Sequence, residues 1–377
     1  MNNSAPQGSV APLSANQTAD SQSSHTSARG TSSSQNLLRI VRNSLPGGGK
    51  FVKGTHAPNQ SRASARGTQS TSSSNSPQPR AAPEEDLFLF KAIELYREKN
   101  FPESLKYFNR ILYKKENVVT PNSDRCSHLF ATRVKANFYK ACMLYHGNGV
   151  KKDIAEANEL FKGIWKDMKS VPDSDDDKLF YLARMKDEGW GTRVNKKEAL
   201  IYYIRSTNRR GTDRNAIAYF NLGLMYYLGE GVHKSYEKTR QMYSVAASMG
   251  HMSATYNLAV MYRDGVGGPK NTSEALRLYH LNAQRGDAKS MNSYALMMKQ
   301  NNPQECLFWL RKAIKKGNAY ALYNMAFILE NGHIIEQDLA KALHYYQEAA
   351  RHGHVSAIES ASILQRQIRK TLILGNV

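Results

Sequence analysis

The chain has 377 residues, of which 41% are hydrophobic, and a formal net charge of +20 at pH 7. This excess of positive charge favours acidic partners, such as an acidic protein surface, nucleic acid or an anionic membrane. The three cysteines, Cys126, Cys142 and Cys306, are scattered and odd in number, which argues against a disulfide framework, and no apolar run approaches the ~18 residues needed to span a bilayer.

The first predicted element, residues 1–83, is a tail without regular structure. It contains one acidic residue, Asp20, against eight basic ones, and serine, threonine, glutamine and asparagine fill most of the rest. Such a segment has too little apolar surface to offset the entropy lost when its backbone is ordered. We therefore expect residues 1–83 to be disordered and to carry part of the net positive charge.

The composition of the tail also bears on the cellular location of the protein. The tail lacks the apolar core of a secretory signal peptide. It is poor in acidic residues and rich in serine, as mitochondrial presequences are, yet its first basic residue is Arg29 and only residues 37–45 resemble an amphipathic stretch. We expect a cytoplasmic protein, with a mitochondrial location as the alternative, and the sequence leaves open whether the tail is a cleaved targeting peptide.

Residues 84–377 are predicted to fold as a helical array, and residues 84–117 as its first helix pair. This segment resembles a tetratricopeptide repeat (TPR) unit, because small and apolar residues occupy the successive positions of that motif: Ala92, Leu95, Phe101, Ser104, Phe108 and Ile111.

Residues 123–353 repeat one pattern six times. Each unit has an apolar helical stretch, a Gly-x-Gly turn, a second helical stretch and, in most units, a closing glycine. The turns lie at Gly147/Gly149, Gly189/Gly191, Gly229/Gly231 and Gly265/Gly267, and the closing glycines are Gly250, Gly286, Gly317 and Gly353. The fifth unit replaces the turn with Asn301-Asn302-Pro303, which predicts a shorter loop. Such a period is the signature of a solenoid.

Three columns of side chains recur in register through these units. A small residue marks the first helix: Ala141, Ala183, Gly223, Ala259, Ala295 and Ala326. A mostly small residue marks the second helix: Ala157, Ala199, Thr239, Ala275, Cys306 and Ala342. Four residues later comes an aromatic one, replaced by Leu310 in the fifth unit: Phe161, Tyr203, Tyr243, Tyr279 and Tyr346. Antiparallel helices can cross closely only where side chains are small, and an aromatic ring fills the space beside the crossing.

In these columns and turns the chain resembles the SEL-one-like repeat family, which is related to TPR proteins. Residues 218–232, AYFNLGLMYYLGEGV, match the family's pattern most fully. The resemblance implies an all-α fold, a right-handed α-solenoid of antiparallel helix pairs, and a role as a scaffold or assembly factor. Residues 354–377 are then expected to form a capping helix, because the last repeat must present a polar outer face.

Few segments of the sequence resemble a catalytic or ligand-binding motif, and each departs from the pattern it resembles. Residues 46–50 lack the spacing and the preceding strand of a phosphate loop. Residues 173–177 resemble the start of a calcium loop, but Lys178 and Arg184 stand where that loop needs glycine and glutamate, so we interpret them as an acidic helix start. Ser174 beside these aspartates is a hypothetical kinase site. We predict no catalytic, cofactor-binding or metal-binding residue, and we expect that the protein is not an enzyme.

Partner-binding residues are expected on the concave face, which the first helix of each pair lines in TPR-like geometry. Three residues before the small column lie Phe138, Phe180, Phe220, Tyr256 and Tyr323. Four residues after it lie Tyr145, Tyr227, Arg263 and Lys299. The aromatic row would suit the apolar anchors of a peptide. The alternative is that this row packs against the neighbouring repeat.

Together these patterns predict a non-enzymatic protein–protein interaction adaptor or scaffold that binds segments of one or more proteins. The alternative is a mitochondrial assembly or expression factor that binds RNA through its basic surface, an interpretation supported only by charge. The sequence does not predict the partner or the oligomeric state.

Overall fold

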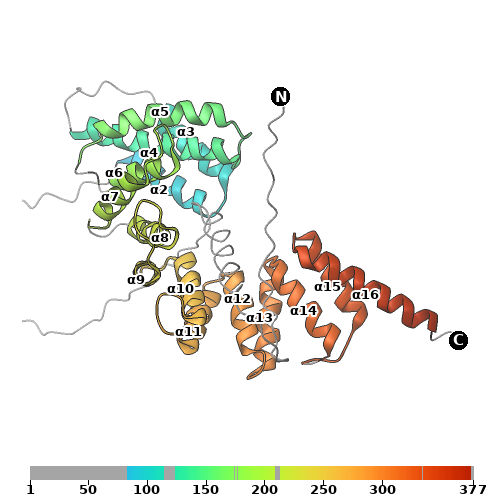
Figure 1. Ribbon diagram of the computed structural model, residues 1–377. Helices are drawn as coiled ribbons and strands as arrows, with labels where there is room; N and C mark the ends of the chain where they lie inside the picture. The colour runs from blue at the N-terminus through green and yellow to red at the C-terminus, as the bar shows by residue number, and fades with distance from the viewer. Residues whose placement is uncertain are drawn as a thin grey trace, which may run out of the picture. The chain divides into compact units, whose positions relative to one another are not determined.

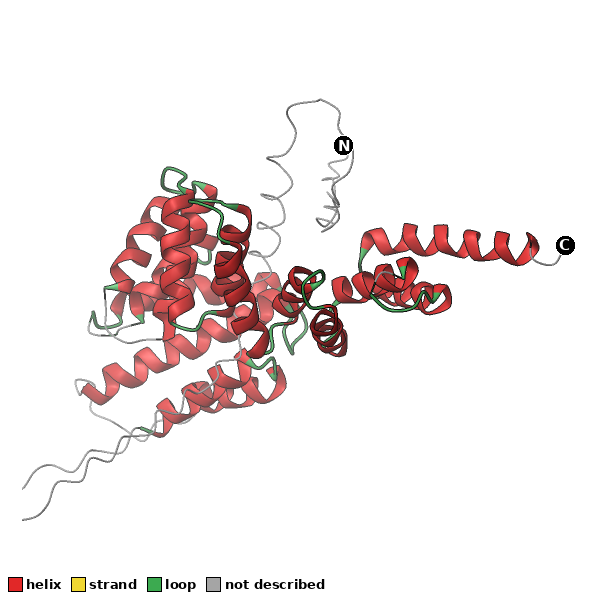
Figure 2. Ribbon diagram, turned by 90° about the horizontal axis from the view of Figure 1, so that it is seen from below, coloured by secondary structure: helices red, strands yellow, loops and turns green. Residues whose placement is uncertain are grey.

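The computed structural model describes residues 83–113, 124–173, 175, 177–208, 213–332 and 334–374. The predicted disordered tail up to residue 82, including residues 46–50, lies outside the described residues, as does Ser174. Throughout the described ranges every regular element is a helix and none is a strand, which confirms the all-α prediction (Figure 2).

The described residues divide into two compact units. The N-terminal unit contains the described residues up to Ala218 together with Glu230–Val232, and the C-terminal unit contains Tyr219–Gly229 and the residues from His233 onward. Helix α8 (Asp213–Leu228) contributes to both. The two units are described separately below.

The N-terminal unit is built of three helix pairs and the start of α8 (Figure 1). The helices are α2 (Glu84–Arg97) with α3 (Phe101–Tyr113), α4 (Asp124–His146) with α5 (Ile154–Ser170), and α6 (Lys178–Glu188) with α7 (Lys196–Thr207). The two members of each pair pack against one another, and α3 also packs against α4. The first pair is therefore stacked on the second, as expected for consecutive repeats.

The C-terminal unit continues the pattern from the end of α8 (Figure 1). Its helices are α9 (Tyr236–Ser248), α10 (Met252–Asp264), α11 (Thr272–Gln284), α12 (Ala288–Met298), α13 (Pro303–Lys315), α14 (Ala319–Asn331), α15 (Leu339–Arg351) and α16 (Val355–Leu374). Each packs against the next along the chain. The loop between α12 and α13 is shorter than the one between α10 and α11, as the missing Gly-x-Gly turn predicts.

Local sequence signals explain where the second helices begin. The residue before each one accepts a hydrogen bond from the backbone N–H three residues later, and these capping residues are Asp153, Asn195, Ser235, Asn271, Asn302 and Asp338. Such a side chain satisfies one of the free N–H groups at a helix start. The side-chain amides of Asn195 and Asn302 also donate a hydrogen bond each to the carboxylate of a glutamate three residues later. Each second helix therefore starts at a position set by its own sequence.

The small and aromatic columns meet in the core. Gly223 and the five alanines of the first-helix column are buried. The aromatic column is buried as well, with at most 1% of Phe161, Tyr203, Tyr243, Tyr279 or Tyr346 exposed. A Cβ added at Gly223 would lie 2.6 Å from the Tyr243 ring, so the two helices approach as closely as a glycine allows.

The second glycine of each Gly-x-Gly turn meets the preceding helix pair. A Cβ added at Gly231 would lie 2.5 Å from the backbone of Lys196, and one at Gly191 or Gly267 would overlap the carbonyl of Phe161 or Tyr236. The turn therefore joins adjacent repeats by backbone contact, in addition to reversing the chain.

Candidate functional site

Four of the residues predicted to bind a partner lie in the core. Phe138 is 1% exposed, and Phe180, Phe220 and Tyr227 are also buried. The Phe138 ring lies 4.7 Å from that of Tyr181. Positions i and i−3 of a helix are neighbours. Phe138, Phe180 and Phe220, three residues before the small column, therefore turn toward the packed face. Together with Tyr227, four residues after that column, they are not available to a partner in this structure.

The other five predicted residues are partly exposed. In the N-terminal unit Tyr145 lies at the end of α4, beside the ring of Trp190 at 5.8 Å. In the C-terminal unit the remaining four lie on α10, directly after α12 and on α14. We call them the inner-helix row: Tyr256, Arg263, Lys299 and Tyr323.

A hydrogen bond of 2.8 Å from the side chain of Asn324 to that of Asn292 links α14 to α12. Both amides are partly exposed. The bond shows that these two first helices approach one another at this point, so that side chains of α12 and α14 share one surface. Asn324 is not among the predicted partner-binding residues, although Asn221 and Asn257 occupy the same place two residues before the small column.

Neighbouring aromatic and charged groups hold the inner-helix row in place. The Tyr256 ring lies 5.6 Å from that of Tyr279, and burial raises the Tyr256 pKa. Two hydrogen bonds of 2.8 Å from the Arg263 guanidinium to Asp264 raise the Arg263 pKa, and Lys299 lies 5.3 Å from the centre of the Phe327 ring. The row therefore presents partly exposed tyrosine rings, which suit apolar groups of a ligand, and positioned cations, which suit acidic groups.

Tyr323 ends the row and is the most enclosed by rings. It stacks on His354 at 4.3 Å and lies 5.2 Å from the Tyr346 ring. The Tyr346 hydroxyl in turn donates a hydrogen bond of 2.6 Å to Glu330. These contacts fix the position of the Tyr323 ring on α14.

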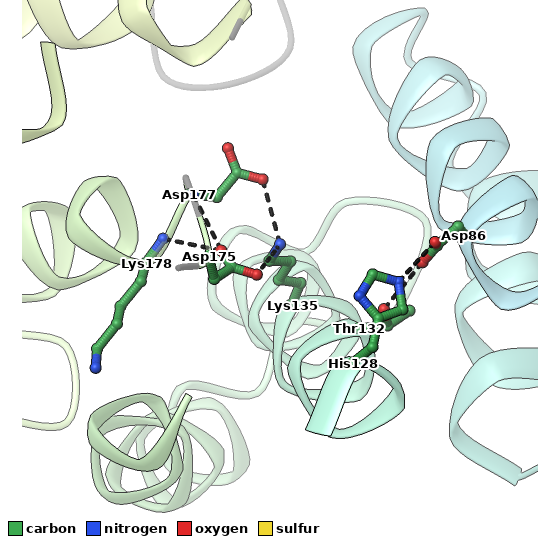
Figure 3. A network of polar contacts seen from close by, with 7 residues as sticks. All are labelled: Asp86, His128, Thr132, Lys135, Asp175, Asp177 and Lys178. Carbon is green, nitrogen blue, oxygen red and sulfur yellow. Dashed lines mark hydrogen bonds and ion pairs between the residues drawn. The ribbon is translucent and has the colours of Figure 1, made fainter. Parts of the chain in front are cut away.

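The acidic segment 173–177 is engaged in ion pairs (Figure 3). Lys135 on α4 pairs with Asp175 at 2.6 Å and with Asp177 at 3.3 Å. Lys178 donates to Asp173 at 2.7 Å and to the backbone carbonyl of Val171 at 2.7 Å. The Lys135 ion pairs join the segment to α4, and Lys178 at the start of α6 bonds both to the segment and to the end of α5.

The expectation of an acidic helix start accounts for only part of this segment. The Asp175 carboxylate accepts hydrogen bonds from the backbone N–H groups of Asp177 and Lys178, as a helix-start residue does. Its pairing with Lys135 was not predicted, because that lysine is 40 residues earlier in the sequence. In the same view, Asp86 on α2 accepts from His128 at 2.6 Å and from Thr132 at 3.1 Å, which joins α2 to α4 (Figure 3).

In the ranges that the structure describes, no three His, Cys, Asp or Glu side chains are grouped closely enough to hold a metal ion. Cys142 and Cys306 are buried free thiols. No helix in these ranges combines the length and the apolar character needed to cross a membrane.

Comparison with known proteins agrees with the repeats seen here. The family model described as Sel1 repeat, the SEL-one-like repeat of the sequence analysis, matches six segments: residues 134–162, 179–209, 216–251, 253–287, 282–318 and 319–354. These segments cover more than half of the chain.

Two crystal structures are similar. One is a Sel1 repeat protein from Oxalobacter formigenes, with 21% sequence identity, 70% of this chain and 96% of that chain covered, and a TM-score of 0.47. The other is a protective antigen present in uropathogenic Escherichia coli strains that displays an SLR fold, with 22% identity, 75% of this chain and 59% of that chain covered, and a TM-score of 0.50. At this identity the second likeness indicates the fold alone.

Proposed function

Because the chain belongs to the Sel1 repeat family, whose solenoids are typically non-catalytic protein-interaction modules, we propose that it is an adaptor. It binds a segment of a partner protein along the first helices of its C-terminal unit. Such solenoids act through extended surfaces formed by consecutive repeats. The binding surface is the inner-helix row together with Asn292 and Asn324.

The observation that carries this proposal is the composition of the row. Tyrosine and arginine are over-represented among the residues that dominate binding energies, because they combine a large apolar area with hydrogen-bonding groups. Tyr256 and Arg263 lie partly exposed on α10, and Tyr323 lies partly exposed on α14. The amides of Asn292 and Asn324 add donors and acceptors that can pair with the main chain of an extended segment.

The row also favours an acidic partner. Arg263 on α10 and Lys299 directly after α12 are both partly exposed cations. Opposite charges across an interface steer association and fix its register. A partner segment with carboxylates between apolar residues would match this pattern of cations and rings.

The test is a comparison of two charge-reversal variants of the full chain. R263E/K299E reverses the two cations of the row, whereas R311E/K315E reverses two exposed cations on α13, a second helix of the same unit. Both variants change the net charge equally. Partners are to be identified by proximity labelling in the native cells and quantified for each variant, with circular dichroism to verify folding.

We expect the partners to be lost with R263E/K299E and retained with R311E/K315E. Equal loss in both variants would indicate binding by overall charge, and full retention in R263E/K299E would place the binding surface elsewhere. Either result contradicts the proposal.

RNA binding is a second candidate function, and one feature of α13 favours it. Phe308 is 49% exposed, and Lys312 lies 4.3 Å from the centre of its ring. Exposed aromatic rings beside cations suit stacked bases and phosphates. RNA affinity that persists at physiological salt in the wild type and falls in R311E/K315E would support this function over the adaptor.

A further inference from the structure

Arg184 of α6 is a buried cation in the N-terminal unit. Only 5% of the residue is exposed. Its Nη2 atom is buried without a hydrogen-bond partner, and no carboxylate in the described part of the chain forms an ion pair with it. The guanidinium lies 4.8 Å from the centre of the Trp190 ring and 5.8 Å from that of Phe138. Its surroundings are therefore mainly aromatic.

Other hydrogen-bonding groups near Arg184 are also unsatisfied. The Nε2 atom of His146 and the hydroxyl of Tyr96 are buried without a partner at hydrogen-bond geometry, although the Asn148 side chain is near the hydroxyl. Both groups are close enough to Arg184 for its charge to lower their pKa values, an effect that burial outweighs at Tyr96. The three groups come from α2, α4 and α6, and all three can donate a hydrogen bond.

Burying the Arg184 charge and these unsatisfied donors costs folding free energy unless a negatively charged hydrogen-bond acceptor is present. A buried charge without a partner costs several kcal/mol, and a cation–π contact of a desolvated cation recovers about 2 kcal/mol. A water molecule could accept one hydrogen bond, but it would not neutralise the guanidinium. Glu188, one turn farther along α6, is the acidic group whose charge acts on Arg184, but its side chain is exposed and forms no ion pair with the guanidinium.

We infer that Arg184 is the centre of an oxyanion-binding site in the N-terminal unit, and that its ligand is a carboxylate group. A carboxylate can accept two parallel N–H···O bonds from one guanidinium, and its remaining lone pairs can accept from the Tyr96 hydroxyl and from His146. Glu188 is exposed one turn away and His146 is half-buried, so the site lies close beneath the surface.

The carboxylate can come from a free carboxylic acid or from a partner segment, at its C-terminus or on an aspartate or glutamate side chain. Only the second source rests on the proposed adaptor function. The first is independent of it, so the two sources are tested separately.

The first experiment exchanges sodium chloride for sodium acetate at constant ionic strength and follows thermal unfolding of the full chain. We expect acetate to raise the wild-type Tm by about 3–6 °C at ten times its Kd, because it binds only the folded state. R184M should show no acetate response, and in chloride it should be at least as stable as the wild type, since it removes an uncompensated buried charge.

K166M is the matched control, because it removes one exposed cation from α5 of the same unit without touching the site. It should respond to acetate as the wild type does. The inference is overturned if the wild type does not respond, if R184M responds equally, or if K166M loses the response, which would indicate screening of the overall charge.

A second measurement keeps the test valid if R184M folds poorly. R184K keeps the charge but lacks the planar fork, so its acetate response should be much smaller than that of the wild type. The buried Cys142 thiol reacts only when the N-terminal unit opens, so its modification is followed by mass spectrometry at intermediate urea in each buffer. In the wild type, acetate should lower the rate of Cys142 modification in proportion to the fraction of protein left unbound. An unchanged rate would contradict binding at this site.

The second experiment identifies the source of the carboxylate with three pentapeptides, measured by calorimetry against the wild type and R184M. One peptide has a free C-terminal carboxylate, one is its C-terminal amide, and one is the amide with a single aspartate. Arg184-dependent binding of the first or third peptide assigns the ligand to a chain terminus or to a side chain. If acetate binds and no peptide does, the ligand is a free carboxylic acid, and the adaptor function must then rest on the C-terminal unit alone.

Discussion

The imidazole of His251 accepts a hydrogen bond of 3.1 Å through Nδ1 from the backbone N–H of Ala254, at the start of α10. The ring also stacks on Phe220 at 4.6 Å. A ring nitrogen can accept only when it carries no proton, so this cap requires a neutral imidazole. Burial agrees with this requirement, because it lowers the pKa of His251 to about 4.

Stability should therefore depend on pH through His251. Below its ordinary pKa of 6.5 the unfolded chain binds a proton at this residue, whereas the folded chain does not until about pH 4. Stability is then lost as the pH falls between these values, by about 2 kcal/mol from this residue at pH 5. The free energy of unfolding in urea at pH 7 and pH 5 measures the loss.

H251D is the control for this prediction. The next first helix, α12, begins at Asp287, whose carboxylate accepts from the backbone N–H of Ser290 at 2.8 Å. An aspartate at residue 251 should keep the cap and remove most of the loss at pH 5. An equal loss in H251D and the wild type would assign the effect to other groups.

The second prediction concerns the helix crossing at Gly223. G223A places a methyl group against the Tyr243 ring and should destabilise the protein by about 1–3 kcal/mol. Gly163 on α5 has open space around its Cβ position, so G163A should stabilise by about 0.5–1 kcal/mol through helix propensity alone. Urea denaturation checks both, and a stabilising G223A would mean that the crossing has room for a methyl group.

The third prediction separates backbone strain from repeat packing. Gly267 and Gly286 both have positive φ, of 74° and 96°, so alanine at either should cost about 1–2 kcal/mol. A Cβ at Gly267 would also overlap the Tyr236 carbonyl, whereas the nearest atom at Gly286 is the end of the Lys316 side chain at 3.6 Å. G267A should therefore be clearly less stable than G286A in thermal denaturation, and similar values would show that this turn does not join adjacent repeats.

The fourth prediction uses the buried thiols to follow each unit separately. Burial raises the pKa of Cys142 in the N-terminal unit to about 12 and that of Cys306 in the C-terminal unit to about 11. Only the thiolate reacts with alkylating reagents, so both should resist iodoacetamide at pH 8 in the native protein and react fully in urea. Mass spectrometry of the two peptides at intermediate urea then reports which unit opens first. Rapid labelling of native Cys142 would contradict its burial.

Much of the fold could be predicted because its signals are local. The closing glycines, the small columns and capping residues such as Asn195 and Asn302 each act within one helix pair. The sequence pattern repeats these signals in register from one helix pair to the next. The helices, their approximate order and the family can therefore all be predicted from the printed sequence.

The site could be predicted only in part. Tyr227 and Arg263 occupy the same column in consecutive repeats, yet the first is buried and the second is partly exposed. The difference depends on what lies next to each helix, since a helical position fixes the direction of a side chain but not its neighbours. The same limit explains why Asn324 was overlooked.

The sequence by itself determined the helical repeats, their turns and the residues at the helix crossings, because these depend on contacts between residues close together in the chain. Only the tertiary structure decided which aromatic residues are buried, that Lys135 pairs with Asp175, and that Arg184 is enclosed between rings without an ion pair in the described part of the chain. Burial and the partner of a charge depend on the stacking of separate repeats, whose distance in the chain leaves no local pattern.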